Sequence, residues 1–318
     1  MSAIHRIARV ILFSVMVLST GVVRGQDYPN KPIRIVTPAG GAGDFVARLI
    51  AEKITGPLGQ PIIVDGRSTV IAVETVAKEA PSDGYTLLVA GNSLWIGPLL
   101  QKMPYDPLRD FAPISLLDRA PNVLVVHPSL PVHSVKELIT LAKAKPGELN
   151  YATGSIGSSD HLAAELFKSV AGVNITGINY KAQGPALNGV IGGEVQLMFN
   201  TASSAMPFVK SGRLTALGVT SAQPSALVPG VPPISATLPG YESGSLIGLL
   251  APSNTPAMIV NRLNQEIVRV INRADMKERF MSLGAEPVGS SPEEFAATMK
   301  SDIAKWGKVI KDAGIHVE

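Results

Sequence analysis

The chain has 318 residues, of which 46% are hydrophobic and 17% are charged, and it contains no cysteine. This composition is typical of a globular protein whose hydrophobic core must hold it without disulfide bridges. The formal net charge is +3, and three of the basic residues lie within the first 25 positions. The remainder is therefore close to neutral and shows no basic cluster, which excludes nucleic acid as an expected partner.

The first residues have the pattern of a secretory signal peptide. Arg6 and Arg9 precede an apolar run from Val10 to Leu18, and Val23-Arg24-Gly25 supplies the small residues of a cleavage site. The apolar run is too short to span a bilayer as a helix, and an uncleaved N-terminal anchor is the alternative interpretation. We expect residues 1–25 to be removed, and because no cysteine is present for lipid attachment, we expect a free periplasmic protein.

Short apolar runs alternate with helical patterns along the rest of the chain. Such alternation predicts an α/β fold with mostly parallel sheets that are covered by helices on both faces. The predicted strands, in chain order, are Ile33–Val36, Ile62–Val64, Thr86–Ala90, Asn122–Val126, Leu149–Ala152, Gln196–Asn200, Leu214–Thr220 and Leu246–Ala251.

Helix boundaries are marked by capping residues. Asp44 is expected to begin one helix, and Gly172 is expected to end the helix that follows the loop at residues 153–161. Capping boxes, in which a Ser caps the helix and a Glu three residues later reaches back, are found at Ser134-Val-Lys-Glu137 and Ser291-Pro-Glu-Glu294. The first should begin a helix that ends near Lys145, and the second a helix that ends near Gly314. Thr255-Pro256 is expected to begin another, because proline is favoured at the first helical position.

Two strand–loop–helix units carry most of the functional information. One loop reads Gly40-Gly-Ala-Gly-Asp44, and the other reads Thr153-Gly-Ser-Ile-Gly-Ser-Ser-Asp-His161. Glycines let a ligand approach the backbone, and the N–H groups at a helix N-terminus attract an anion. Each loop alone is equally well explained as ordinary turn chemistry. Together, facing each other across a cleft, they predict a protein that binds a small anion such as a carboxylate.

Three further polar residues could contribute to this cleft. Asn92 and Ser93 follow the strand Thr86–Ala90, and Asn200 ends the strand that begins at Gln196. Ligands of α/β proteins lie beyond the carboxyl ends of strands. Simple capping of the strand end is an equally good interpretation of Asn200.

No pattern indicates an enzyme, a cofactor or a metal. A phosphate-binding Gly-x-x-x-x-Gly-Lys motif is absent, Val46 stands where a dinucleotide fingerprint needs a small residue, and the Gly-x-Ser-x-Gly pattern fails around Ser155. His161 opens a helix, whose dipole is expected to lower its basicity. The histidines are too scattered for a metal site: His5, His127, His133, His161 and His316.

With these residues in view, nearly the whole mature chain resembles the Bug-type periplasmic receptors, the solute-binding subunits of tripartite tricarboxylate transporters. The resemblance is carried by Tyr28-Pro-Asn-Lys-Pro-Ile-Arg-Ile-Val36, Pro81-Ser-Asp-Gly-Tyr-Thr-Leu-Leu88, Tyr105-Asp-Pro-Leu-Arg-Asp-Phe-Ala-Pro113, Asn122-Val-Leu-Val-Val126, Leu149-Asn-Tyr-Ala152, Gly157-Ser-Ser-Asp-His-Leu162, Tyr180-Lys181, Pro185-Ala-Leu187, Leu197-Met-Phe199 and Gly284-Ala-Glu-Pro-Val-Gly289.

The resemblance implies a two-domain "Venus flytrap" of the type II periplasmic-binding class. Domain 1 would comprise residues 26–124 and 248–318, and domain 2 residues 125–247, with hinges near Val125 and Gly248. A monomer would hold a small carboxylate between the domains and deliver it to membrane permease subunits. An orphan sensor that passes its signal to a regulatory partner is the alternative.

In the family, the loop after the first strand and the Gly-Ser loop of the second domain grip the ligand carboxylate. Here the first loop looks two residues short, and Arg67-Ser-Thr-Val-Ile-Ala-Val73 replaces a Gly-rich stretch. We therefore expect a ligand that differs from the family's typical dicarboxylates, or weakened binding. The expected ligand-binding residues are Ala39, Gly40, Gly41, Asp44, Asn92, Ser93, Thr153, Ser155, Gly157, Ser158 and Asn200.

Overall fold

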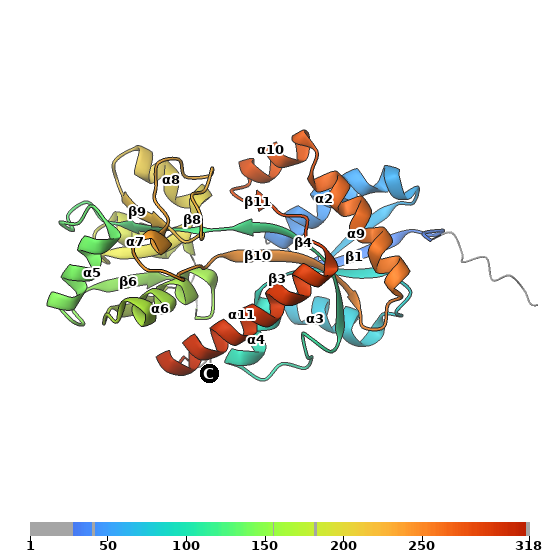
Figure 1. The fold of residues 1–318 in the computed structure, drawn as a ribbon, viewed down its shortest axis with the longest axis horizontal. Helices are drawn as coiled ribbons and strands as arrows, with labels where there is room; N and C mark the ends of the chain where they lie inside the picture. The colour runs from blue at the N-terminus through green and yellow to red at the C-terminus, as the bar shows by residue number, and fades with distance from the viewer. Residues whose placement is uncertain (1–27, 40–41, 155, 181–182, 316–318) are drawn as a thin grey trace, which may run out of the picture.

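The computed structural model describes residues 28–39, 42–154, 156–180 and 183–315. The predicted α/β fold is confirmed, with two sheets whose faces are covered by helices (Figure 1). We call each sheet with its covering helices a lobe. The predicted signal peptide, Gly40, Gly41 and Ser155 lie outside the described residues.

The first lobe is built on a six-stranded sheet with the order β11-β4-β10-β3-β1-β2. Its strands are β1 (Ile33–Pro38), β2 (Ile62–Arg67), β3 (Thr86–Gly91), β4 (Phe111–Ala120), β10 (Ser245–Pro252) and β11 (Glu286–Pro287). Its helices are α2 (Ala42–Leu58), α3 (Thr69–Glu74) with a π-helical turn (Thr75–Glu79), α4 (Ser93–Leu100), α9 (Ala257–Ile271), α10 (Ala274–Ser282) and α11 (Pro292–Ala313).

The second lobe is built on a five-stranded sheet with the order β7-β6-β8-β5-β9. Its strands are β5 (Asn122–Val126), β6 (Asn150–Thr153), β7 (Thr176–Asn179), β8 (Leu197–Thr201) and β9 (Thr215–Val219). Its helices are α5 (Val135–Ala144), α6 (Ser159–Ala171), α7 (Gln183–Ile191) and α8 (Ala202–Lys210), and a short 3-10 turn (Ile234–Ala236) lies in the segment that leads back to the first lobe.

The sheets are mixed, and the prediction of mostly parallel sheets is wrong. Strands joined through helices pair in parallel, as β1 does with β2 and β3, and β6 does with β7 and β8. The strands that carry the chain between the lobes pair antiparallel, namely β4 and β10 in the first sheet and β5 in the second. Strand β4 runs straight into β5 with one residue between them, so no helical crossover reverses its direction there.

The chain passes from one sheet to the other at Pro121 and just before Ser245, within a few residues of the hinges predicted near Val125 and Gly248. We call these two segments the crossings. Val125 is paired on both sides within β5, and Gly248 is paired within β10, where a Cβ atom would lie 2.1 Å from the Phe295 ring. The predicted domain boundaries therefore fall inside these strands. Continuous pairing and close packing make both positions poor places for a bend.

Thr220 ties the two crossings together. Its hydroxyl accepts a hydrogen bond from the Asn122 amide (2.8 Å) and donates one to the Ser243 carbonyl (2.8 Å). The backbone of Thr220 also bonds to both of these residues. Beside them, a Cβ atom at Gly244 would lie 2.9 Å from the Ala120 carbonyl oxygen. The segment before β10 therefore passes directly against the segment between β4 and β5. We call these two crossings, together with Thr220, the joint.

Three hydrophobic clusters hold the lobes. One fills the face of the first sheet under α2, α9 and α10, and another fills the face of the second sheet under α7 and α8. The third spans both lobes, because α11 packs against α4 of the first lobe and α6 of the second (Figure 1). It contains Trp95, whose indole N–H donates to Asp302 of α11 at 3.1 Å, and Tyr241, whose hydroxyl donates to the Ala163 carbonyl at 2.8 Å. The lobes are therefore joined along the α11 side.

The capping signals predicted helix boundaries well. The full capping box at Ser291 and Glu294 is present, and α11 ends at Gly314 with φ of 62°. Gly172 ends α6 in the same left-handed conformation. At Ser134 the box is changed, because the hydroxyl accepts from the Glu137 amide but the Glu137 carboxylate accepts from the His133 amide instead. Helix α2 begins at Ala42, two residues before Asp44, which lies in its first turn.

We expect Gly248→Ala to lower the free energy of unfolding by about 1–3 kcal/mol, because the added methyl group overpacks the Phe295 ring. Gly307→Ala in α11 is the matched control, since its Cβ would have Leu99 at an ordinary 3.9 Å. That change should raise stability by roughly 0.5–1 kcal/mol through helix propensity. Urea unfolding of both variants measures the effects, and an unaltered midpoint for Gly248→Ala would contradict the packing described.

Candidate functional site

A cavity of about 460 Å³ lies between the lobes, and we call it the cleft cavity. Both lobes and both crossings contribute to its wall. The described residues that line it are Ala42, Phe45, Val46, Asp118, Ala120, Ser159, Gln183, Thr201, Ser203, Ser245, Ile247, Leu283, Gly284 and Ala285.

Four helices begin at the cleft cavity. Ala42 opens α2, Ser159 opens α6, Gln183 opens α7, and Thr201 is the N-cap residue of α8. The first N–H groups of a helix have no partner within the helix, and the helix dipole places partial positive charge there. The cavity therefore has positive backbone potential, and none of its described lining residues is a lysine or an arginine. Such a wall suits a small carboxylate.

The Gly-Ser loop of the second lobe is held in place by the first turn of α6. Asp160 is fully buried, and its carboxylate accepts from the Gly154 amide (2.7 Å) and the Thr153 hydroxyl (3.2 Å). The ring nitrogen Nδ1 of His161 accepts from the Gly157 amide at 3.2 Å. Burial lowers the pKa of His161, and this is a larger cause than any neighbouring charge. The imidazole is thus kept neutral as an acceptor, so it anchors the loop.

A second cavity of about 250 Å³, the loop cavity, lies where this loop meets the first lobe. Its described lining includes Pro38 and Ser93 on one side and Ile156 and Gly157 on the other. Gly157 has φ of 80°, and a Cβ atom there would lie 2.5 Å from Leu100 of α4. Glycine is therefore required at this position both by the backbone conformation and by the close approach of the lobes.

The lobes also touch across the far rim of the cleft. A Cβ atom at Gly284 would lie 2.8 Å from that of Ser203, at the start of α8. The Ser225 hydroxyl donates a hydrogen bond to the Glu286 carboxylate. Contacts therefore enclose the cleft cavity on both sides, as expected of a closed arrangement.

The predicted site residues fall into different places. Ser93 and Gly157 line the loop cavity, and Thr153 and Ser158 belong to the Gly-Ser loop. Asn92 instead donates from Nδ2 to the Gly244 carbonyl at 3.1 Å, so it supports the crossing.

The other three described residues lie at strand and helix ends. The Ala39 amide donates to the Arg67 carbonyl at 2.8 Å, and Asp44 forms an ion pair with Arg48 at 3.0 Å. Asn200 is buried, and its side-chain oxygen accepts from the Thr201 amide at 2.7 Å. This arrangement matches strand-end capping, and the next residue, Thr201, is the one that lines the cleft cavity.

None of the described residues predicted for the site lines the cleft cavity, and Asp118 is the one ionisable side chain among the described residues that do. Its side chain lines the cleft cavity, is only 1% exposed, and neither carboxyl oxygen has a hydrogen-bond partner among the described residues. Burial raises the pKa of Asp118 to about 8. No motif surrounds it in the sequence, and its orientation depends on an irregularity in strand pairing.

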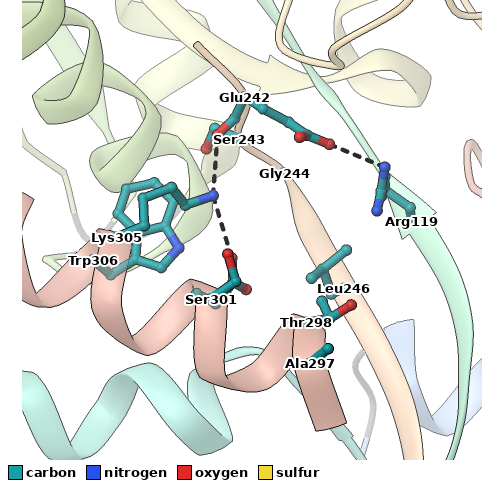
Figure 2. Close-up of a pocket in the computed structure, with 11 residues that line it drawn as sticks. Arg119, Glu242, Ser243, Gly244, Leu246, Ala297, Thr298, Ser301, Lys305 and Trp306 are labelled. Carbon is teal, nitrogen blue, oxygen red and sulfur yellow. Dashed lines mark hydrogen bonds and ion pairs between the residues drawn. The ribbon is translucent and has the colours of Figure 1, made fainter. Parts of the chain in front are cut away.

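A third cavity of about 350 Å³, the back cavity, lies on the opposite face of the β4–β10 pair (Figure 2). Arg119 forms an ion pair with Glu242 (3.0 Å), and Lys305 of α11 donates to the Glu242 carbonyl (3.2 Å) and pairs with Asp302 (3.2 Å). These bonds link β4, the second crossing and α11. Because partners of opposite charge already pair within it, we assign this cavity a role in supporting the joint.

Within the described ranges, no group of three or more potential metal-ligating residues is found. No helix in the same part of the chain has the length and apolar character needed to cross a bilayer.

Residues 46–315 match the model of the tripartite tricarboxylate transporter family receptor. The chain belongs to this family. Protein BugT of Bordetella pertussis is 33% identical over 305 residues, covering 93% of this chain and 93% of that protein. The Bug-type resemblance is therefore confirmed.

Solved structures of similar proteins support the same assignment. The structure of R. palustris Rpa4515 with adipate has 37% identity and a TM-score of 0.74, and it covers 91% of this chain and 99% of that chain. MatC from Rhodopseudomonas palustris with bound malate has 30% identity and a TM-score of 0.69, covering 89% and 100%. The two-lobed receptor fold expected from the resemblance is thus confirmed.

Asp118 should make stability depend on pH. The pKa of Asp118 is about 8 in the folded protein, whereas that of an ordinary, solvated aspartate is 3.8. Between these two pH values the folded protein therefore holds one more proton than the unfolded chain. Stability contributed by this group therefore falls as pH rises from about 4 to 8. Asp118→Asn removes this dependence, so the variant should gain stability relative to the parent across that window.

Burial alone raises this pKa. Charged groups on the elements beside β4 have partners of their own: Asp44–Arg48 in α2, Arg262–Glu266–Arg269 in α9, Asp302–Lys305 in α11, Glu286 with Ser225, and Arg119–Glu242. Urea unfolding at pH 5, 7 and 9 tests the prediction. A constant difference between variant and parent at all three values would show that Asp118 does not hold the extra proton.

Proposed function

We propose that the protein is a periplasmic receptor that captures one small carboxylate between its lobes and delivers it to the permease subunits of a tripartite transporter. The observation that carries this proposal is the convergence of four helix N-termini on the cleft cavity. Family membership supports it, as do the adipate and malate bound by two similar proteins.

Recognition would rest on backbone N–H groups and hydroxyls in place of a cationic side chain. Ser159, Thr201 and Ser203 supply hydroxyl groups at the N-termini of α6 and α8. The apolar part of the wall comes from Phe45, Val46 and Ile247. Fixed backbone dipoles need no reorganisation when the ligand enters, and closure removes competing water. The ligand would favour the closed arrangement because only there do both lobes contact it.

Export through the predicted signal peptide, residues 1–25, places the receptor in the periplasm. The contacts between the lobes at Gly157 and Gly284 would form only in the closed state that the permease subunits recognise. No resident cofactor or metal takes part in this proposal, and we expect a monomer.

The first test is a thermal-shift screen of residues 26–318 against mono-, di- and tricarboxylates, followed by calorimetry on each hit. A ligand that binds only the folded protein raises the melting temperature by mass action. A saturable shift with at least one carboxylate is expected. No shift with any carboxylate, together with binding of uncharged solutes, would overturn the proposal.

Ser159→Asp should separate binding from folding. A carboxylate at the start of α6 stabilises the helix by about 0.3–1 kcal/mol, but it places negative charge in the cleft cavity. The variant should keep or raise its melting temperature and lose carboxylate binding. Ala257→Asp, at the exposed first position of α9, adds the same charge outside the cavity wall and should bind normally. Equal binding of carboxylate by both variants would show that the ligand does not bind at the N-terminus of α6.

A further inference from the structure

The inference begins with the unsatisfied carboxyl group of Asp118. A buried polar group without a partner costs free energy, and a buried charge costs more. Within the part of the chain that the structure describes, both Asp118 oxygens lack a hydrogen bond, while the side chain lines the cleft cavity and is 1% exposed. A group that costs stability in the empty protein and faces the ligand space is a candidate for function.

A β-bulge in β4 aims this carboxyl into the cleft. Along β10, Leu246 faces α11 and Ile247 faces α2. The register pairs Leu116 with Gly248 and Asp118 with Ile247, so Leu117 is the extra residue. Leu117 and Asp118 therefore both face the α2 side, and alternation resumes with Arg119 in the back cavity. Without the bulge, Asp118 would face the opposite side.

We propose that Asp118 is the specificity-determining residue for a ligand that carries a cationic nitrogen in addition to its carboxylate, such as an amino carboxylate. This inference rests on the proposed function, because the carboxylate end still binds the helix N-termini. The ammonium end would supply the hydrogen-bond donor and the positive charge that Asp118 lacks.

The composition of the cavity wall favours a cation over a second carboxylate. Asp118 is the one ionisable side chain among the described residues that line it. Phe45 lines the same wall with 60% of its surface exposed, and an aromatic face attracts cations. A dicarboxylate would place its second negative charge near an acid, and the described residues of the wall include no cationic side chain to balance it. The alternative, in which protonated Asp118 donates to a ligand carboxylate, gives opposite results in the test below.

The experiment compares ligands that differ only in replacing a terminal methyl group by an ammonium group. The probes are butanoate and 3-aminopropanoate, pentanoate and 4-aminobutanoate, and hexanoate and 5-aminopentanoate, with glutarate as the dicarboxylate. Calorimetry on the mature protein should show at least about tenfold tighter binding of one amino member than of its methyl counterpart. In Asp118→Asn this preference should fall to about twofold or less.

Arg119→Gln is the matched control, because it lies on the same strand but faces the back cavity. It should keep the preference for the amino ligand. If Asp118→Asn does not fold, proton release by the parent protein still tests the inference. Binding of an ammonium group converts protonated Asp118 to its anion, so binding heats at pH 7 in buffers of different ionisation enthalpy should report release of up to about one proton.

The outcomes distinguish the inference from the proposed function. Preference for the amino ligand with proton release supports it. Tighter binding of glutarate without proton release would overturn it and favour protonated Asp118 as a donor. Equal binding of all pairs by parent and variant would overturn it while leaving the carboxylate receptor intact. If the protein binds neither these carboxylates nor any in the wider screen, the proposed function itself is contradicted.

Discussion

The antiparallel pairing of β4 with β10 is the interaction on which both the fold and the site depend. These strands carry the chain out of the first lobe and back into it, so their pairing fixes where the second lobe starts. The alternation of their side chains also supplies two cavities, with Asp118 and Ile247 facing the cleft and Arg119 and Leu246 facing the back. One bulged residue, Leu117, sets this assignment, because a shift of one position exchanges the two faces of a strand.

This pairing separates two electrostatic environments by the thickness of one sheet. On the back face, Arg119, Glu242, Lys305 and Asp302 neutralise one another across β4, the crossing and α11. On the cleft face, positive potential comes from helix termini and the acid has no partner. Charges on the back face stabilise the joint, whereas the uncompensated groups of the cleft remain for a ligand. A chain of nearly neutral composition can therefore still present a strongly polar site.

Local signals in the sequence predicted much of the fold. The capping box at Ser291, the left-handed glycines at Gly172 and Gly314 and most of the strands follow from short-range chemistry. Strand β4 was missed because Pro113 and the pair Asp118-Arg119 interrupt its apolar pattern. The crossings lie a few residues before the predicted hinges, because apolar runs alone do not reveal which sheet a strand joins. The mixed pairing likewise depends on how the crossing strands enter each sheet.

The site was predicted less completely because its polar groups depend on tertiary contacts. The Gly-Ser loop was found, but the residues that hold it are Asp160 and His161, which reach backward from the helix. Asn92 and Asn200 stand at strand ends as expected, yet their side chains bond to the protein itself. Asp118 shows the opposite behaviour. No motif surrounds it in the sequence, yet its carboxyl oxygens have no hydrogen-bond partner among the described residues. A polar residue at a strand end is therefore a weak guide to function until its hydrogen bonds are known. The groups left without partners after folding identify the ligand space more directly than the groups that a motif selects.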